Sequence, residues 1–120
     1  MEIYEQETKL YKSLMHPARL AILDLLREGE ACVCHMEATF EYRQAYISQQ
    51  LMVLRDAGLV EDRRDGLNIY YRVIRSEIFD VLDAMRKVTG IRTKAAKPKR
   101  NACTCPNCVG ESVKPQLIQI

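Results

Sequence analysis

The chain has 120 residues, a charged fraction of 28% and a net charge of +2 at pH 7. This length is typical of one domain, and the near balance of charge excludes a strongly basic field over the whole surface, so any contact with nucleic acid must come from local clusters. No apolar run approaches the ~20 residues of a membrane-spanning helix, and the first residues lack the pattern of a signal peptide, so we expect a cytoplasmic protein with no membrane partner.

Two helices are predicted at the start of the chain. An apolar stripe at helical spacing predicts the first over residues 2–15. The residue before Pro17 disfavours helical backbone angles, so the first helix ends there, and Pro17 suits the first turn of a second helix, with His16 at its start. Residues 18–26 are apolar nearly all round, which places the second helix at the centre of the core, and Gly29 ends it.

A helix-turn-helix follows. A short helix is predicted over residues 33–40, then a turn at 41–43 and a longer helix over 44–57, with apolar residues at helical spacing from Ile47 to Leu54. The other face of the longer helix carries amides and a hydroxyl but almost no charge. Such groups can bind base edges or phosphates in a DNA major groove, although an ordinary surface helix can show the same pattern. The candidate DNA-contacting residues here are Arg43, Gln44, Ala45, Tyr46, Ser48 and Gln49.

The next segment is predicted to be a β-hairpin. Two β-rich runs flank Asp65-Gly66, a dipeptide that favours a hairpin turn, and Arg63, Arg64 and Arg72 lie on or near the hairpin. Taken by itself, this segment is equally consistent with a solvated hairpin that carries ordinary surface arginines. Directly after a helix-turn-helix, it favours a wing whose Arg63 and Arg64 contact phosphates. The expected fold class is therefore mainly α with a small β-hairpin wing, a winged helix-turn-helix.

The chain is predicted to end in one more helix and a tail. Ser76 is expected to cap a fifth helix that Gly90 ends. Its apolar face, like that of the first helix, has no later element to cover it, so we expect a homodimer through the first and last helices. Residues 91–120 lose helical periodicity and are expected to be a flexible, basic, cysteine-containing tail, which leaves residues 1–90 as the DNA-binding and dimerisation domain.

The five cysteines form two tight groups. An odd number of cysteines in a reducing compartment argues against a structural disulfide framework. Clustered thiols favour soft-metal binding or redox chemistry over packing in a core, although buried apolar cysteines and a disordered thiol-rich tail stay open as alternatives. The candidate metal ligands are Cys32, Cys34, Cys103, Cys105 and Cys108.

The spacing of the first pair sets a geometric condition. Cys32 and Cys34 face opposite ways in an α-helix but the same way in an extended segment, so one ion can take both thiolates only if the segment is extended or the helix start is distorted. Two thiolates do not complete a soft-metal site, because As(III) favours three and Cd(II), Pb(II) or Zn(II) three or four. The linker of about 13 residues from Gly90 to Cys103 reaches up to ~40 Å, so one or two tail thiolates can join the pair, or the tail can bind a metal separately.

This order of elements resembles the ArsR/SmtB family of metal-sensing bacterial repressors over about residues 5–90. Residues 30–36, Glu-Ala-Cys-Val-Cys-His-Met, look like the metal-binding box of the family, and residues 44–51 and 54–60 look like its recognition helix and the exit from it. The resemblance implies a homodimer that represses an operator in double-stranded DNA and leaves it when metal binds. It implies neither enzyme activity nor an organic substrate.

The chain departs from the family pattern at two places. Glu37 stands where some arsenic- and antimony-responsive members carry a third cysteine, and the last helix has Glu77, Asp80 and Asp83 but no histidine, so the zinc site that other members hold there is not expected. The predicted effector is As(III), Cd(II), Pb(II) or Zn(II) bound by cysteine thiolates. The alternatives are a redox- or persulfide-sensing repressor of the same fold, a structural-zinc protein, and a thiol-disulfide enzyme, which the lack of a βαβ pattern disfavours.

Overall fold

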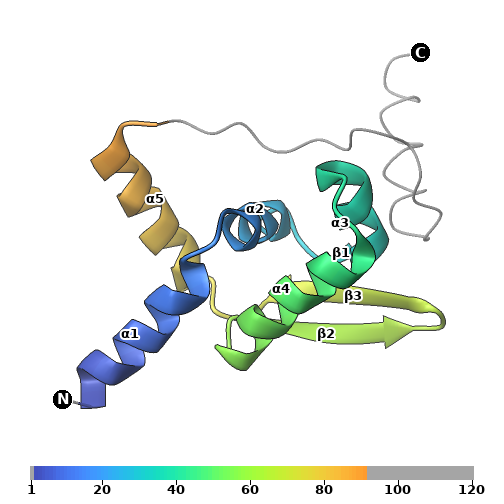
Figure 1. Ribbon diagram of the computed structural model, residues 1–120, viewed down its shortest axis with the longest axis horizontal. Helices are drawn as coiled ribbons and strands as arrows, with labels where there is room; N and C mark the ends of the chain where they lie inside the picture. Colours follow the sequence, from blue (N-terminus) through green and yellow to red (C-terminus); the bar gives the residue numbers. More distant parts are fainter. Residues whose placement is uncertain (1, 92–120) are drawn as a thin grey trace.

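The computed structural model describes residues 2–91. Its architecture is mainly helical with a small antiparallel sheet, as predicted (Figure 1). None of the helices in the described part of the chain combines the length and apolar character that a membrane span needs. The elements in chain order are α1 (Glu2–Leu14), α2 (Pro17–Leu26), β1 (Ala31–Cys32), α3 (Val33–Phe40), α4 (Gln44–Asp56), β2 (Val60–Asp65), β3 (Asn68–Val73) and α5 (Glu77–Thr89).

Helices α2 and α4 supply the centre of the hydrophobic core. In α2, Ile22 and Leu23 are fully buried, and Figure 1 shows this helix between α5 and α3. In α4, the predicted stripe of Ile47, Leu51 and Leu54 is also fully buried. Burying such side chains contributes roughly 1.5–3 kcal/mol each, so this stripe determines which face of α4 remains outside.

The sheet contains one strand that was not predicted from the sequence. Its strand order is β1-β3-β2, and β1 comprises only two residues, Ala31 and Cys32, which pair with Tyr71 and Tyr70 of β3. Two residues are too short a run to produce a detectable alternation of apolar and polar side chains. This pairing holds the segment before α3 against the hairpin.

The turn of the hairpin is shifted by one residue from its predicted place. Asp65 pairs with Asn68 as the last residues of the two strands, so the loop consists of Gly66 and Leu67. Gly66 has a φ of +63°, a value that glycine adopts without steric cost and that two-residue hairpin loops require at their first position.

The predicted cap of α5 is wrong in one respect. Ser76 occupies the N-cap position, but its side chain makes no capping hydrogen bond. An N-cap side chain reaches the first free N–H groups of a helix from an extended backbone, whereas Ser76 has helical angles (φ −62°, ψ −20°). The C-terminus of α5 is as predicted, with Gly90 in the left-handed conformation.

Ion pairs hold α5 on α2. Asp24 of α2 accepts hydrogen bonds from Arg86 of α5 and from Arg27, and Arg27 also lies 3.0 Å from Asp83 of α5. The hydrogen bond from Arg27 holds the pKa of Asp83 below its usual range. These contacts and the burial of Ile78 and Leu82 fix the position of α5, while Val81, Met85 and Val88 remain exposed.

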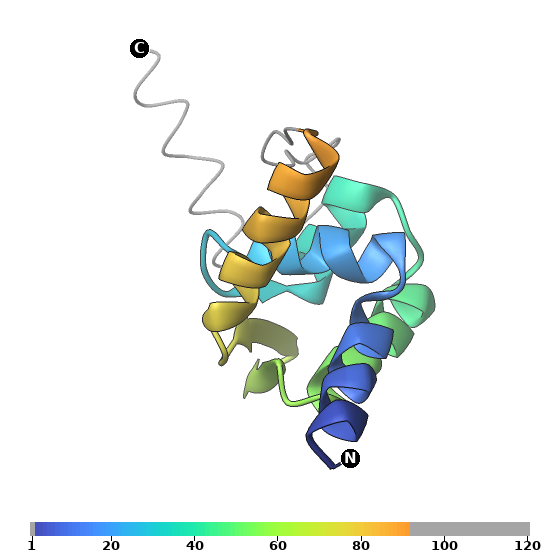
Figure 2. The ribbon, with the colours of Figure 1, turned by 90° about the vertical axis from the view of Figure 1, so that its left-hand side faces the viewer.

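Helices α1 and α5 lie on one side of the molecule, and both carry exposed apolar side chains. Figure 2 looks onto that side and shows both helices in front of α2, away from the tip of the hairpin. Their exposed apolar residues are Ile3, Tyr4, Leu10, Tyr11, Met15, Val81, Met85 and Val88. The apolar faces of the two helices are therefore only partly covered in the single chain, since Ile78 and Leu82 of α5 are buried in the core while the residues above are exposed.

Candidate thiol site and nucleic-acid interface

Cys32 and Cys34 lie where β1 ends and α3 begins, and their sulfurs are joined in a disulfide. Cys32 has an extended backbone (φ −86°, ψ 161°), and its Sγ accepts the N–H of His35 at 3.2 Å, which caps α3. Cys34 lies in the first turn of α3. The change from strand to helix between the two residues turns both sulfurs to the same side, with 5.4 Å between the Cα atoms. The odd number of cysteines argued against a structural disulfide framework, and it did not predict this local bond between residues two positions apart, which the backbone geometry allows.

The two cysteines differ in exposure. Cys32 is only 2% exposed, whereas Cys34 is partly exposed. Cys32 and Tyr70 of β3 form a small buried cluster that is separate from the main core, and Cys34 packs against this cluster. Cys34 is therefore the sulfur that an incoming reagent or ion meets first.

The described residues supply two soft-metal donors. Thiolates are the ligands that soft ions prefer, so the pair fits such an ion once its disulfide is reduced. Within residues 2–91, however, no group of three or more Cys, His, Asp or Glu side chains is placed to hold a metal ion. The predicted ligands Cys103, Cys105 and Cys108 lie outside the described residues.

Most of the predicted DNA-contacting side chains of α4 share its outer face. Arg43, Gln44, Ala45 and Gln49 are exposed and Ser48 is partly exposed. Arg43 is the N-cap residue and no side chain caps this helix, so its first N–H groups point outward. The neighbouring Gln50 is buried.

Tyr46 differs from the other predicted contacts, because its hydroxyl binds the protein. The Oη atom lies 3.1 Å from Nε2 of His16, and the ring packs edge-on against Tyr42 at 5.1 Å between centroids. His16 accepts the N–H of Ala18 at Nδ1, so a neutral imidazole carries its proton on Nε2 and donates to Tyr46. His16 was predicted to lie at a helix start, but this link between α2 and α4 was not predicted.

The two consecutive arginines of the wing have different surroundings. Arg63 donates from Nε and Nη2 to the carboxylate of Glu30, at 3.0 and 2.5 Å, and its guanidinium lies 4.6 Å above the ring of Tyr70. The hydrogen bond to Glu30 raises the pKa of Arg63 above its ordinary value. Arg64 points to the opposite face of the strand, and within the described part of the chain it makes no ion pair. Arg72, the third predicted arginine, pairs with Glu61.

The sequence has clear relatives. A family model for the bacterial regulatory proteins of the arsR family matches residues 16–62. The biofilm growth-associated repressor of Xylella fastidiosa is 37% identical over 87 residues, which cover 72% of this chain and 76% of that protein. The chain belongs to the ArsR family. A repressor of the same name from Agrobacterium fabrum is 42% identical, over 63% of this chain and 65% of that protein.

Two further comparisons extend this assignment. The arsenic resistance transcriptional regulator ArsR1 of Pseudomonas putida is 44% identical, over 58% of this ArsR-family chain and 53% of that protein. A solved homodimeric winged helix-turn-helix DNA-binding domain from Mycobacterium bovis is 29% identical, covers 78% of this chain and 86% of its own, and has a TM-score of 0.67. The ArsR-family chain is accordingly a transcriptional repressor with a winged helix-turn-helix fold, and its relatives are regulators rather than enzymes.

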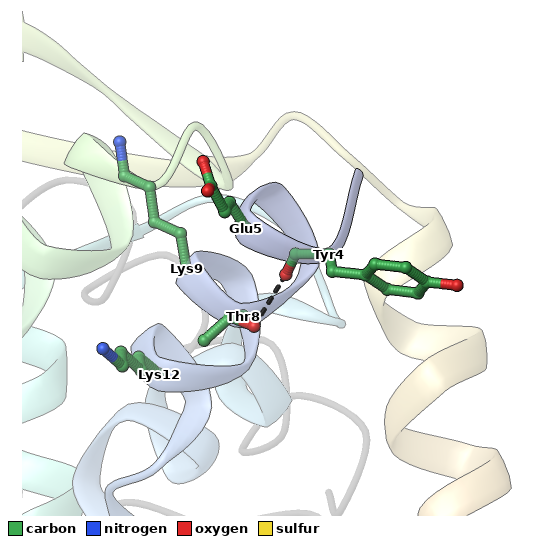
Figure 3. Close-up of a pocket in the computed structure, with 5 residues that line it drawn as sticks. All are labelled: Tyr4, Glu5, Thr8, Lys9 and Lys12. Atoms are coloured by element: carbon green, nitrogen blue, oxygen red, sulfur yellow. Dashed lines mark hydrogen bonds between the residues drawn. The ribbon is translucent and has the colours of Figure 1, made fainter. Parts of the chain in front are cut away.

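One surface hollow of this ArsR-family repressor lies over α1. Its volume is about 390 Å³, and its lining residues, all from α1, are Tyr4, Glu5, Thr8, Lys9 and Lys12. Figure 3 shows that their side chains diverge, with Tyr4 on one side of the helix and Lys9 and Lys12 on the other. Side chains that diverge from a single helix do not converge on a ligand, so we assign no binding site to this hollow.

Proposed function

We propose that this ArsR-family repressor binds operator DNA as a homodimer and releases it when a soft thiophilic ion, As(III), Cd(II), Pb(II) or Zn(II), binds its cysteine thiolates. The observation that carries the proposal is the convergence of the Cys32 and Cys34 sulfurs at the start of α3. This helix packs against α4 and precedes it in the helix-turn-helix. An ion at the pair therefore acts on the element that supports the DNA-contacting helix.

The proposed ligand set combines the pair with the tail. The metal ligand is the thiolate, so the disulfide must first be reduced, as the cytoplasm in which we expect this repressor to act allows. Two thiolates leave a soft-metal site incomplete. We assign the remaining positions to one or two of Cys103, Cys105 and Cys108, on the basis of residue type and the length of the linker.

The proposed DNA interface consists of the outer face of α4 and the wing. Gln44, Ala45, Ser48 and Gln49 face outward on α4 and suit the base edges of a major groove. Arg43, Arg63 and Arg64 are assigned to phosphates, since guanidinium groups bind phosphate strongly and the N-terminus of α4 favours an anion. Tyr46 borders this surface, and we assign to it the anchoring of α4 through His16.

The proposed dimer interface is formed by α1 and α5. The two helices lie on the side of the molecule opposite the tip of the wing (Figure 1), and both carry exposed apolar side chains. A two-fold axis through that side buries both stripes and leaves two wings outward. The homodimeric domain from Mycobacterium bovis supports this assignment by its similarity.

A second candidate function is redox sensing, which the Cys32–Cys34 disulfide specifically favours. The oxidant can be a low-molecular-weight disulfide. Each protein thiol then gives up a proton and an electron, a sulfur–sulfur bond forms between Cys32 and Cys34, and the oxidant is reduced to two small thiols. This reaction needs no third ligand.

Titration of DNA binding separates the two candidates. The probe is a DNA duplex that the reduced protein selects from a random-sequence library, called the selected duplex below. A metal switch loses affinity on addition of As(III), Cd(II), Pb(II) or Zn(II), by a factor near or above the upper end of the ~5–150-fold range of allosteric couplings. A redox switch loses affinity for the selected duplex only on addition of oxidised glutathione. If neither treatment changes the affinity, the thiols have no regulatory role and both candidates fail.

A further inference from the structure

Three side chains lie in one row across the sheet. In register, Cys32 of β1 is opposite Tyr70 of β3, and Tyr70 is opposite Arg63 of β2. Directly opposed residues of neighbouring strands project from the same face, so all three are on one side of the sheet. The Tyr70 ring, only 1% exposed, forms a buried cluster with Cys32, against which Cys34 packs, and lies beneath the guanidinium of Arg63. The buried ring of Tyr70 therefore lies between the two cysteines and Arg63 of the wing.

A second contact connects the same two places. Glu30, two residues before Cys32, accepts both hydrogen bonds from the edge of the Arg63 guanidinium. Arg63 therefore contacts the carboxylate of Glu30, which directly precedes the strand of Cys32, and the ring of Tyr70, which lies in the same cluster as the two cysteines. Nε and Nη2 form one bidentate edge of the guanidinium, so a DNA phosphate can bind that edge only by displacing Glu30, while Nη1 lies 3.9 Å from Asp65.

We propose that Glu30 keeps its hydrogen bonds to Arg63, and so prevents Arg63 from contacting DNA, when Cys32 and Cys34 are joined by an S–S bond or by a shared ion. When the thiols are separate, a DNA phosphate replaces Glu30 as the partner of Arg63. This inference rests on the proposed thiol switch and assigns its output to the wing. Joining the sulfurs ties the end of β1 to the first turn of α3, which restrains Glu30, directly before β1, where its carboxylate reaches Arg63 of β2.

The exposure of the ion pair suits such a switch. The side chains of Arg63 and Glu30 are 51% and 26% exposed. Exposed ion pairs add little to stability, so a phosphate can displace the carboxylate once Glu30 is free to shift. Arg64 offers a matched comparison, because it is adjacent in sequence, points to the other face and has no carboxylate partner among residues 2–91.

The test is the salt dependence of binding to the selected duplex, measured in two thiol states of the full chain. One state is kept reduced by excess small thiol. The other is treated with oxidised glutathione, and peptide mapping verifies that Cys32 and Cys34 are joined. Each phosphate contact adds about 0.9 to the slope of log affinity against log salt. Equal thermal unfolding of wild type and variants verifies that the substitutions leave the fold intact.

Because the proposed homodimer carries two copies of Arg63, we expect Arg63→Ala to lower the slope by about 1.8 in the reduced state, about 0.9 for each phosphate contact, and to leave it unchanged in the joined state. Arg64→Ala should lower it equally in both. Glu30→Gln should restore the Arg63 contribution in the joined state, whereas Glu61→Gln, which removes the carboxylate partner of Arg72, should not.

The outcomes separate this inference from the function on which it rests. A wild-type affinity that responds to neither metal nor oxidant overturns the thiol switch itself. A second outcome is that the wild-type affinity responds to metal or oxidant, but Arg63 contributes equally to the salt slope in both thiol states or in neither. That outcome overturns only the role of Glu30. Identical slopes for Glu30→Gln and Glu61→Gln in the joined state would also overturn that role and leave the thiol switch standing.

Discussion

The hydroxyl of Tyr46 lies 3.1 Å from Nε2 of His16, thirty residues earlier in the chain, and joins the start of α4 to the start of α2. His16 also caps α2 through the N–H of Ala18. One imidazole therefore sets where two helices begin relative to each other. The position of the proposed DNA-contacting helix depends on this link as well as on the apolar core.

Removing that hydroxyl should loosen α4. Tyr46→Phe should lower the free energy of unfolding by about 1 kcal/mol, the usual net contribution of a hydrogen bond, and should weaken binding to the selected duplex. Urea denaturation measures the first effect. Tyr42→Phe is the matched control, because its ring packs on Tyr46 while no hydrogen bond of its hydroxyl is found in the described residues. Equal losses in both variants would contradict a special role for the His16–Tyr46 contact.

Replacing either sulfur of the pair should uncouple the switch. Cys32→Ser and Cys34→Ser should bind the selected duplex as tightly as wild type, because neither residue lies on the outer face of α4. Both should keep that affinity when metal is added, since a hydroxyl is a poor ligand for soft ions. Fluorescence anisotropy with and without metal measures the effect. Normal release by either variant would exclude the pair as the site.

The tail cysteines should matter for metal but not for oxidation. Replacing Cys103, Cys105 and Cys108 together by serine should weaken metal binding by more than tenfold, because loss of a direct ligand costs at least as much as the ~10–100-fold effect of an outer partner. The response to oxidised glutathione should persist, since Cys32 and Cys34 suffice for an S–S bond. Competition with a metal-binding dye measures the affinity. An unchanged metal affinity would restrict the site to the pair.

The outer face of α4 should recognise sequence. Gln49→Ala should weaken binding to the selected duplex by about 1–3 kcal/mol and leave binding to an unrelated duplex nearly unchanged, because amide contacts to base edges carry sequence information. Gln6→Ala is the control, since Gln6 is an exposed glutamine on α1. If Gln49→Ala weakens both duplexes equally, Gln49 contacts the DNA backbone instead.

The ion pairs between α2 and α5 should stabilise the fold. Asp24→Asn removes the charged partner of Arg86 and Arg27, both of which are partly buried, and should lower the free energy of unfolding by about 1–2 kcal/mol. Glu28→Gln, an exposed position just after α2, should change it by less than about 0.5 kcal/mol. Urea denaturation of both variants measures the difference, and similar values would assign no role to Asp24.

The same contacts predict a dependence on pH. Arg27 lowers the pKa of Asp83 in the folded state, so the stabilisation is complete above the ordinary carboxylate pKa and is lost as the pH falls through the lower folded value. Asp83→Asn should therefore reduce the loss of stability on acidification. Urea denaturation at several acidic pH values measures this, and parallel curves for wild type and variant would contradict it.

Several parts of the fold followed from local spacing alone. The buried stripe of α4, the position of Pro17 in the first turn of α2 and the hairpin near Gly66 were all predicted within a residue or two. Apolar residues at helical spacing bury one face, proline restricts its own and the preceding backbone, and glycine tolerates a positive φ. These are properties of short segments, so they can be inferred before any tertiary contact is known.

Contacts between distant segments could not be inferred in this way. The pairing of β1 with β3, the link from His16 to Tyr46 and the hold of Glu30 on Arg63 each join residues at least thirty positions apart. In each of these contacts, the sequence pattern around one residue does not indicate which distant residue it will contact. Their meeting depends on how the helices and the sheet pack.

The sequence by itself determined that Cys32 and Cys34 can act together only at an extended or distorted segment, because side-chain direction follows from backbone conformation. Only the tertiary structure decided that they do, since β1 exists because β3 lies beside it and holds Cys32 extended at the start of α3. The pairing of β1 with β3 also brings Glu30, directly before β1, to Arg63 and brings the sulfurs to the cluster of Tyr70. A two-residue strand has too few hydrogen bonds and too little buried surface to form without its neighbour, which is why the link from thiols to wing is a property of the folded chain.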